Sequence, residues 1–301
     1  MPRAPSRSTC GTPQVKDGFA RLSQPRDRGS GAGSTAYPRL VRTPSELQTL
    51  ALAAAQAAGD VIRASRRAAA PLDAELKGAG DYVTVVDRAA EAAAVAVLRD
   101  ADPSIDVLAE ERGGEVTERM WVIDPLDGTT NFLRGFPEVG VSIALVEEGV
   151  PRVGVVTAPL TGGEWTAIAG KGAFDATGRR LDIRGSAGLG VVATGFPFRC
   201  PAHRPRYLPV LTAALETFED LRRTGAASLD LSYTAAGVWD GFFELNLALW
   251  DIAAGSLLVR EAGGVVSDWH GDERAVFGSG DILAGAPAWH ERMLSLTRAV
   301  A

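Results

Sequence analysis

Residues 121–132 read WVIDPLDGTTNF, and the rest of the chain can be interpreted around them. The apolar, β-prone run 120–123 predicts a strand that delivers two carboxylates three residues apart, Asp124 and Asp127. Pro125 lies between the two acids and has a fixed φ, so their spacing is built into the backbone. The Gly-Thr-Thr that follows favours a turn that opens a short helix.

This combination of acids and turn indicates metal-assisted phosphoryl chemistry. Two anions held so close repel each other unless a cation lies between them. The turn beyond them supplies backbone N–H groups and a hydroxyl, which are groups that hold a phosphate, and carboxylates suit a hard metal ion. An isolated Asp-x-x-Asp spacing is more often a capped helix start with a surface pair of acids. The full string from Asp124 to Phe132 argues against that simpler interpretation.

Two strings carry a family resemblance. DPLDGTTNF at 124–132 resembles the signature of the inositol monophosphatase family of Mg²⁺-dependent, lithium-sensitive phosphatases, and WDIAAG at 250–255 resembles the distal Trp-Asp motif of that family. Glu110 and Glu111, which follow a predicted strand at 105–109, match the Glu-Glu pair that the family places upstream of its signature. Taken alone, Glu110 is more simply a solvated strand end, and Asp251 is a natural helix N-cap.

The resemblance implies a site with two Mg²⁺ ions. One ion would be held by Glu110, Asp124 and the Leu126 carbonyl, and the other by Asp124, Asp127 and Asp251. A third, mostly hydrated ion near Glu110 is a feature of the family. All the candidate side chains are oxygen donors, and a hard set without His or Cys selects Mg²⁺, or Mn²⁺ in its place, over zinc.

The resemblance also implies hydrolysis of a phosphate monoester by a water molecule that the metal activates. We expect Thr129 and Glu110 to orient this water for in-line attack, while Asp124 is shared between the two ions. The backbone N–H groups of Gly128 and Thr129 would hold the phosphate oxygens. The catalytic residues are then Glu110, Asp124 and Thr129, and no nucleophilic side chain is required.

A polyol site is expected beside the metal ligands. Glu244 stands seven residues before Asp251, where a family Glu hydrogen-bonds inositol hydroxyls, and Gly225–Ala227 resembles the loop that lines the polyol. The substrate-binding residues implied by the resemblance are Asp127, Gly128, Thr129, Ala227 and Glu244. Phe196 falls where eukaryotic members have a serine, and it removes a polar sugar contact. Strict inositol specificity is therefore in doubt.

A predicted hairpin precedes the acids in the chain. KGAGDYVTVVD at 77–87 resembles the mobile N-terminal hairpin of the family, in which Lys77 and Asp87 would support the metal ligands from behind or gate the site. The alternative is an exposed hairpin lysine and a helix N-cap at Asp87.

Three functions are compatible with these matches. The preferred one is Mg²⁺-dependent hydrolysis of inositol 1-phosphate or a similar polyol or sugar phosphate. Another phosphatase of the superfamily, acting on fructose 1,6-bisphosphate or 3′-phosphoadenosine 5′-phosphate, is the first alternative. However, Thr130-Asn131-Phe132 differs from the Lys-Gly or Arg-Ala endings associated with relatives that act on nucleotide phosphates or histidinol phosphate. The second alternative is a catalytically silent binding protein, which loss of Thr129 or of a ligand acid would favour. None of these residues is lost.

Charge is unevenly distributed along the chain. Residues 1–42 hold eight Lys and Arg against two acids, whereas the remainder holds 23 against 35. An acidic body argues against a nucleic-acid-binding surface and is compatible with carboxylates that metal ions neutralise. The basic tail is rich in Arg, Ser, Gly and Pro without hydrophobic periodicity, which predicts disorder. A nucleic-acid or membrane tether, or a start codon placed too far upstream, is the alternative.

The remaining composition predicts a soluble, cytoplasmic protein. No stretch approaches the length of a membrane span, and the N-terminus lacks the apolar segment of a secretory signal. The two cysteines, Cys10 and Cys200, exclude a disulfide scaffold and a Cys-based zinc site and fit a reducing cytoplasm. The expected partner is a small-molecule phosphate monoester rather than a nucleic acid or a membrane, and the resemblance implies a homodimer.

The resemblance covers residues 43–300 and implies an α/β fold, a layered αβαβα sandwich like that of the sugar phosphatases. Thr43-Pro44-Ser45-Glu46 predicts a helix start with a capping box. We expect an N-terminal α+β half at 43–185, which carries most metal ligands, and a C-terminal α/β half at 186–301, which completes the metal and substrate site. The predicted helices are 43–70, 87–98, 205–215, 228–236, 251–262 and 288–298. The predicted strands are a hairpin at 76–87 and 105–109, 120–124, 139–146, 152–156, 165–169, 180–183, 191–194, 221–223, 241–244 and 282–284.

Overall fold

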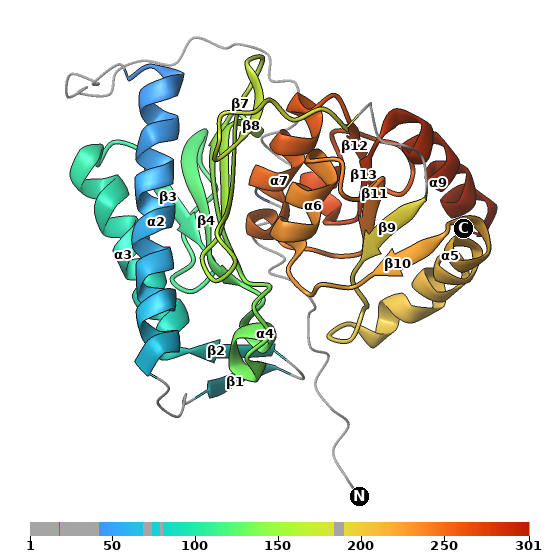
Figure 1. The fold of residues 1–301 in the computed structure, drawn as a ribbon, viewed down its shortest axis with the longest axis horizontal. Coiled ribbons are helices and arrows are strands. Elements are labelled where there is room, and N and C mark those ends of the chain that lie inside the picture. The colour runs from blue at the N-terminus through green and yellow to red at the C-terminus, as the bar shows by residue number, and fades with distance from the viewer. Residues whose placement is uncertain (1–17, 19–41, 69–73, 79–80, 184–189, 301) are drawn as a thin grey trace, which may run out of the picture.

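The structure is a computed structural model that describes residue 18 and residues 42–68, 74–78, 81–183 and 190–300. Nearly all of the predicted basic tail at 1–42 lies outside the described residues. The body is built of five layers, in which two sheets alternate with an outer pair, a middle pair and a second outer pair of helices (Figure 1). The predicted layered αβαβα sandwich is confirmed. The division into halves at residue 185 stays a prediction.

The first outer layer consists of helices α2 (Pro44–Ala68) and α3 (Val85–Ala101). The predicted capping box starts α2, because Thr43 N donates to Glu46 Oε2 at 2.6 Å and Glu46 N donates to Thr43 Oγ1 at 3.3 Å. Asp87 does not begin the next helix. Thr84 is the N-cap of α3, and Asp87 is its third residue, whose carboxylate accepts from Thr84 N at 2.8 Å. The prediction of an N-cap at Asp87 was wrong by one turn. The predicted hairpin before α3 is present as antiparallel strands β1 (Ala74–Gly78) and β2 (Asp81–Thr84).

The first sheet has six strands in the order β3-β4-β5-β6-β7-β8. Its strands are β3 (Asp106–Ala109), β4 (Arg119–Asp127), β5 (Gly140–Glu147), β6 (Val150–Ala158), β7 (Gly163–Ile168) and β8 (Gly172–Asp175). β3 pairs in parallel with β4, and the other pairs are antiparallel. The predicted strand at 180–183 was wrong, since its only ladder contact is an isolated bridge from Phe174 to Arg180. Leu181 and Ile183 are nevertheless buried, so the alternating pattern reported burial rather than strand pairing.

The second sheet has five strands in the order β10-β9-β11-β13-β12. Its strands are β9 (Val191–Thr194), β10 (Asp220–Arg222), β11 (Gly241–Glu244), β12 (Val265–Ser267) and β13 (Ile282–Gly285). Helices α6 (Ala227–Ala235) and α7 (Leu249–Glu261) lie between the sheets, and α5 (Arg204–Thr217) and α9 (Pro287–Val300) cover the far face (Figure 1). Two short helices follow strand β4 and precede strand β13, respectively: α4 (Thr129–Arg134) and α8 (Val276–Ser279). β8 and β12 were not predicted; they have four and three residues, and such short strands give a weak periodic signal.

Apolar side chains fill the space between successive layers. Trp121 and Phe132, both fully buried, belong to the cluster that joins α2 and α3 to the first sheet, whereas Phe242 and Leu258 belong to the cluster around the middle helices. A third cluster that includes Tyr207 lies between the second sheet and its outer helices. These packed layers fix the ends of β4, α6 and α7 relative to one another.

Two further observations concern the expectations on location. No helix in the described part of the chain is long and apolar enough to cross a membrane. Cys200 is buried, and its Sγ lies 3.3 Å from the side-chain nitrogen of Asn246.

Candidate active site

The first two acids meet because β3 and β4 run in parallel and β3 ends where β4 reaches Asp124. Ala109 is paired with Ile123, so Glu110 and Asp124 follow at neighbouring positions. Glu110 N donates to Ile123 O at 3.1 Å and extends the pairing by one residue. Asp124 is 1% exposed, whereas Glu110 is partly exposed. Strand pairing therefore brings a partly exposed and a buried carboxylate to one edge of the first sheet.

An irregularity in β4 separates Asp124 from Asp127. The pairing with β5 shifts between them, since Asp124 faces Ser142 and Asp127 faces Gly140. Leu126 N donates to Asp124 Oδ1 at 3.0 Å, which closes a tight local turn after Pro125. The shift leaves Pro125 and Leu126 without ladder partners, so the Leu126 carbonyl is free of the sheet and lies 3.3 Å from Thr129 Oγ1.

Gly128 allows the chain to turn sharply into α4. It is the N-cap of this helix and has φ +92°, a conformation that a residue with a side chain rarely adopts. A Cβ at this position would also lie 3.0 Å from Glu138 O. The glycine therefore places the backbone N–H groups at the start of α4 directly after the two acids, as the sequence predicted.

Thr129 is fixed by the acid at the start of α3. Its hydroxyl donates to Asp87 Oδ1 at 2.9 Å and lies 3.3 Å from the Leu126 carbonyl oxygen. The other oxygen of Asp87 accepts from Thr84 N and Thr84 Oγ1 in the capping box of α3. Asp87 thus joins the helix start to the candidate site, and both of its oxygens are engaged.

Asp127 accepts hydrogen bonds from a residue far along the chain. Its Oδ2 accepts two hydrogen bonds from Ser228 at the start of α6, from the backbone N at 2.7 Å and from Oγ at 2.6 Å. Gly140 makes room for this contact, since a Cβ there would lie 2.4 Å from Ser228 Oγ. This link between residues 101 positions apart was not predicted. Its only sequence signal was a serine at the start of a predicted helix.

Asp251 lies in the first turn of α7. Its Oδ2 accepts from Ala248 N at 2.7 Å. Ala248 is the N-cap and Asp251 is the third residue of the helix, so the interpretation of Asp251 as the N-cap was wrong. Ser142 Oγ donates to Trp250 O at 3.0 Å and ties this turn to β5, opposite Asp124. The distal motif is thereby docked against the strand that carries the signature.

The four acids act on one another electrostatically. Burial raises the pKa of Asp124 well above its ordinary value, and the charges of Glu110, Asp127 and Asp251 raise it further. Burial, Asp127 and Glu110 likewise raise the pKa of Asp251. Burial also raises the pKa of Asp127, although the hydrogen bonds from Ser228 oppose that shift. In the absence of a cation these carboxyls therefore favour the protonated form.

The donor set fits hard divalent cations. Every candidate side chain supplies oxygen, and the mutual repulsion of the acids is the condition that a cation relieves. The hydrogen bonds use Oδ1 of Asp124 and Oδ2 of Asp251, so the second oxygen of each remains available to a ligand. Among the described residues, no three acidic, His or Cys side chains already stand in a metal-binding cluster.

Glu244 ends β11 on the other side of the candidate site. Burial raises the pKa of Glu244 to about 8, while Arg223 and Arg199 oppose the shift. Its carboxyl group packs against Gly195, where a Cβ would lie 2.1 Å from Glu244 Cδ. Arg199 also acts electrostatically on Asp127 and Asp251, and neither arginine was singled out in the sequence.

Asp230, on α6, is a further acid that sequence reasoning missed. It is 2% exposed, and burial raises its pKa well above the ordinary value, with Glu244 and Asp127 adding to the rise. Its Oδ1 is buried without a hydrogen-bond partner. The sequence carried no signal for it beyond an acid in the first turns of a predicted helix.

The other predicted residues are only partly described. Ala227 is the first residue of α6, directly before Ser228, and is 8% exposed. Gly225 has φ +89°, and a Cβ there would lie 3.2 Å from Asn131 Oδ1, so the predicted polyol loop approaches α4 closely. Lys77 belongs to β1, but its side chain lies outside the described part of the chain.

Comparisons with known proteins match nearly the whole described body. A model of the Inositol monophosphatase family matches residues 43–301. The chain is 43% identical over 257 residues to Nus factor SuhB of Salmonella typhimurium (strain LT2), an alignment that covers 83% of this chain and 95% of that protein.

The chain is also similar to solved structures over most of its length. The chain is similar to the extragenic suppressor protein suhB of Bartonella henselae, with a TM-score of 0.79 and 38% identity over 84% of this chain and 98% of that one. It is also similar to an IMPase of Thermotoga maritima, with a TM-score of 0.75 and 30% identity over 85% and 98%.

Proposed function

The chain belongs to the inositol monophosphatase family, and from this premise we propose that it is a Mg²⁺-dependent phosphomonoesterase that hydrolyses inositol 1-phosphate or a similar polyol phosphate. One observation carries the proposal: the pKa of buried Asp124 is raised by the charges of Glu110, Asp127 and Asp251, which come from separate elements of the fold. Such a concentration of acids costs stability unless cations neutralise it.

The residues proposed to hold the cations are Glu110, Asp124, Asp127, Asp251 and the Leu126 carbonyl. When bound, divalent ions would supply positive charge for the attacking and leaving oxygens of the phosphate ester, whose uncatalysed hydrolysis is among the slowest known reactions. Mg²⁺ is favoured by the donor chemistry, and Mn²⁺ could replace it.

The hydroxyl of Thr129 is proposed to orient the attacking water. Its proton is directed to Asp87 Oδ1, so the oxygen lone pairs are left to accept a hydrogen bond from a water molecule. Asp87 cannot turn away easily, because its second oxygen accepts from Thr84. Glu110, partly exposed at the neighbouring strand end, would accept the other proton of that water.

The phosphate and the alcohol are proposed to bind on opposite sides of the acids. The backbone N–H groups of Gly128 and Thr129, at the start of α4, would donate to phosphate oxygens. Glu244 and the backbone of Ala227 would hold the hydroxyl groups of a polyol. The close packing of the Glu244 carboxyl group against Gly195 supports a polyol-binding role for Glu244, because this packing fixes the direction of the carboxyl group.

A phosphate-release panel tests the proposal and its nearest alternative. The panel contains inositol 1-phosphate, glycerol 2-phosphate, fructose 1,6-bisphosphate and 3′-phosphoadenosine 5′-phosphate, each with Mg²⁺ and with a chelator. We expect the highest kcat/KM on a polyol monophosphate and none with the chelator. A clear preference for the bisphosphate or the nucleotide would replace the proposed substrate while leaving the phosphatase in place.

The relatives also give a reason to keep a non-enzymatic candidate. The curated relatives at 40–45% identity carry the name Nus factor SuhB, which states no phosphatase activity. The chain could have the role that this name denotes and only bind metal or phosphate. Phosphate release from no ester in the panel, by a protein that still binds Mg²⁺, would favour that candidate.

A further inference from the structure

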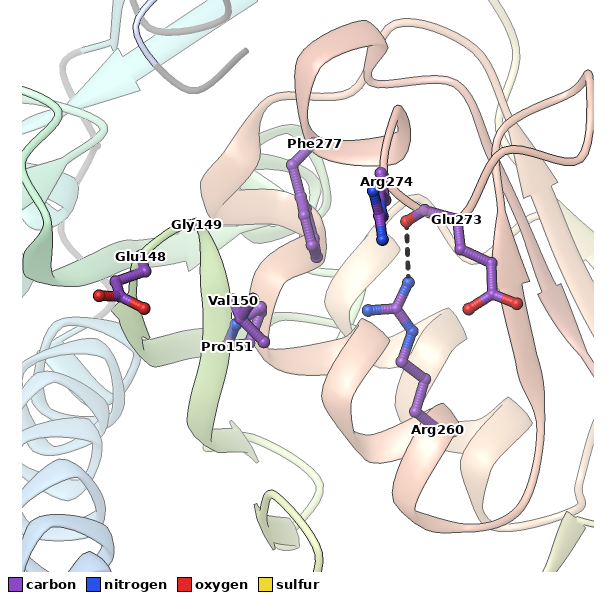
Figure 2. Close-up of a pocket in the computed structure, with 8 residues that line it drawn as sticks. All are labelled: Glu148, Gly149, Val150, Pro151, Arg260, Glu273, Arg274 and Phe277. Carbon is purple, nitrogen blue, oxygen red and sulfur yellow. Dashed lines mark hydrogen bonds between the residues drawn. The ribbon is translucent and has the colours of Figure 1, made fainter. Parts of the chain in front are cut away.

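A pocket lies between the turn from β5 to β6 and the far end of α7 (Figure 2). It has a volume of about 310 Å³, and its lining residues are Glu148, Gly149, Val150, Pro151, Arg260, Glu273, Arg274 and Phe277. Asp251 is in the first turn of α7, whereas Arg260 is in its last turn. The pocket is therefore separated from the candidate active site by the length of a 13-residue helix.

Arg260 is a partly buried cation whose hydrogen bonds are incomplete. One terminal nitrogen donates to Val266 O at 3.3 Å and to Glu273 O at 3.1 Å. Its Nε is buried and has no hydrogen-bond partner among the described residues, and burial lowers the pKa of its guanidinium. Figure 2 shows the other terminal nitrogen directed toward Val150 and Pro151, across the pocket.

A second guanidinium faces the same space. The Arg274 side chain lies beside Phe277 and extends toward Arg260 (Figure 2). Within the described ranges, neither arginine has a carboxylate in ion-pair distance, and Figure 2 shows the carboxylates of Glu148 and Glu273 pointing away from the pocket. The charge of Glu273 acts on Arg260 and raises its pKa, but its carboxylate forms no ion pair with the guanidinium, so an anion in the pocket would be a direct partner for both arginines.

The remaining walls are apolar. The Phe277 ring is buried and lies 5.9 Å from Arg260 Cζ, a distance that permits a cation–π contact. Val150 faces it from the start of β6 and is 43% exposed. Pro151 continues that wall. A ligand that fits must therefore combine negative charge with a flat or apolar part.

We propose that this pocket binds a small organic oxyanion, whose charged group pairs with Arg260 and Arg274 and whose flat apolar part packs between Phe277 and Val150. Guanidinium groups suit carboxylate, sulfonate and phosphonate oxygens because they donate two parallel hydrogen bonds. The proposal is independent of catalysis, since none of these side chains belongs to the candidate active site.

Phenylphosphonate is a suitable probe, because it joins an oxyanion to a flat ring and cannot be hydrolysed as an ester. Its binding is measured by isothermal titration calorimetry in the presence of a chelator, so that no metal at the acids can hold the probe. The full-length protein is compared with three variants, Arg274→Ala, Asp124→Asn and Arg292→Ala. Arg292 is the matched control, an exposed arginine whose Cζ lies 5.6 Å from the Phe218 ring elsewhere on the surface. Arg274 is also exposed, so its removal should leave the fold intact.

We expect the wild type, Asp124→Asn and Arg292→Ala to bind the probe equally. Arg274→Ala should weaken binding by about tenfold or more, as expected for the loss of a hydrogen bond to a charged group. Val150→Glu is a fourth variant, and it should abolish binding by placing a carboxylate in the pocket beside the arginines. Benzyl alcohol, which has the ring without the charge, should not bind in the same range.

Three results would overturn the proposal. Equal binding by Arg274→Ala and the wild type would show that the arginine does not contact the probe. Loss of binding only in Asp124→Asn would place the probe at the acids. Absence of binding by the wild type would show that Arg260 is satisfied by its backbone contacts alone.

Discussion

Replacing Glu244 by Gln should change how stability depends on pH in the metal-free protein. Gln has nearly the same shape, so it can keep the close packing against Gly195. It cannot ionise, however, and so it removes one titrating group from the candidate polyol site. The comparison isolates a single carboxyl, because the other acids remain in both proteins.

The size of the effect follows from the two pKa values. Glutamate has an ordinary pKa of 4.5, and burial raises the pKa of Glu244 to about 8 in the folded protein. The folded state therefore keeps a proton that the unfolded state has lost. The stabilisation linked to that proton is complete below pH 4.5 and is lost as pH rises through the window from 4.5 to about 8.

pH 7 lies about 2.5 pH units above the ordinary pKa of glutamate. The unfolding free energy that the wild type loses between pH 4.5 and pH 7 through Glu244 is therefore at most about 3.4 kcal/mol. Because the side chain keeps some solvent contact, we expect about 2 kcal/mol. Glu244→Gln should then equal the wild type in unfolding free energy near pH 4.5 and exceed it by about that amount at pH 7.

Urea unfolding of both proteins in the presence of a chelator, at pH 4.5, 6, 7 and 8, measures this difference. Glu291→Gln, which removes an exposed carboxyl on α9, is the control, and its difference from the wild type should be constant over the range. Parallel pH curves for Glu244→Gln and the wild type would refute the reasoning, because they would show that Glu244 ionises as easily in the folded as in the unfolded chain.

Three further outcomes concern the candidate site. Ser228→Ala removes the 2.6 Å hydrogen bond from Oγ to Asp127 and should raise the Mg²⁺ concentration for half-maximal activity about tenfold; an unchanged requirement would show that Ser228 does not support a ligand. Gly195→Ala would place a Cβ 2.1 Å from Glu244 Cδ and should raise KM about tenfold with little change in kcat; a loss confined to kcat would contradict a polyol-binding Glu244. Lithium should inhibit uncompetitively, as the family resemblance implies, and competitive inhibition against the substrate would count against retention of that metal site.

The layered fold was predictable because the elements that frame the site give strong local signals. The capping box at Thr43 marks the start of α2, and the apolar run before Asp124 lies within β4. Glu110 was placed beside Asp124 on the assumption that neighbouring strands end together, and the parallel pairing of β3 with β4 supplies that register.

Two predictions of secondary structure that were wrong concern a strand and a helix cap. Leu181 and Ile183 are buried and alternate as in a strand, yet they follow an isolated bridge and form no ladder. Asp87 was taken as a helix cap because it precedes an Ala-rich run, but Thr84 provides the cap and Asp87 completes it. A capping box has two partners, and the sequence alone did not show which of them comes first.

Contacts between distant segments could not be predicted. The hydrogen bonds from Ser228 to Asp127 span 101 residues, and their formation depends on the packing of α6 against the first sheet. The unpaired arginines of the pocket depend in the same way on a turn of the first sheet meeting the end of α7. Neither arrangement leaves a periodic or motif signal in the chain.

Phosphate release from inositol 1-phosphate by the wild type and Asp124→Asn, first with a chelator and then with excess Mg²⁺, tests the central claim most directly. The account predicts that the wild type is inactive with the chelator and recovers fully with Mg²⁺. The variant should stay below about a tenth of wild-type activity in Mg²⁺ while it unfolds at or above the wild-type temperature, since one of several mutually repelling acids has been removed. Full wild-type activity after exhaustive chelation, or more than about a tenth of that activity in the variant, would contradict a site in which Asp124 holds the catalytic cations.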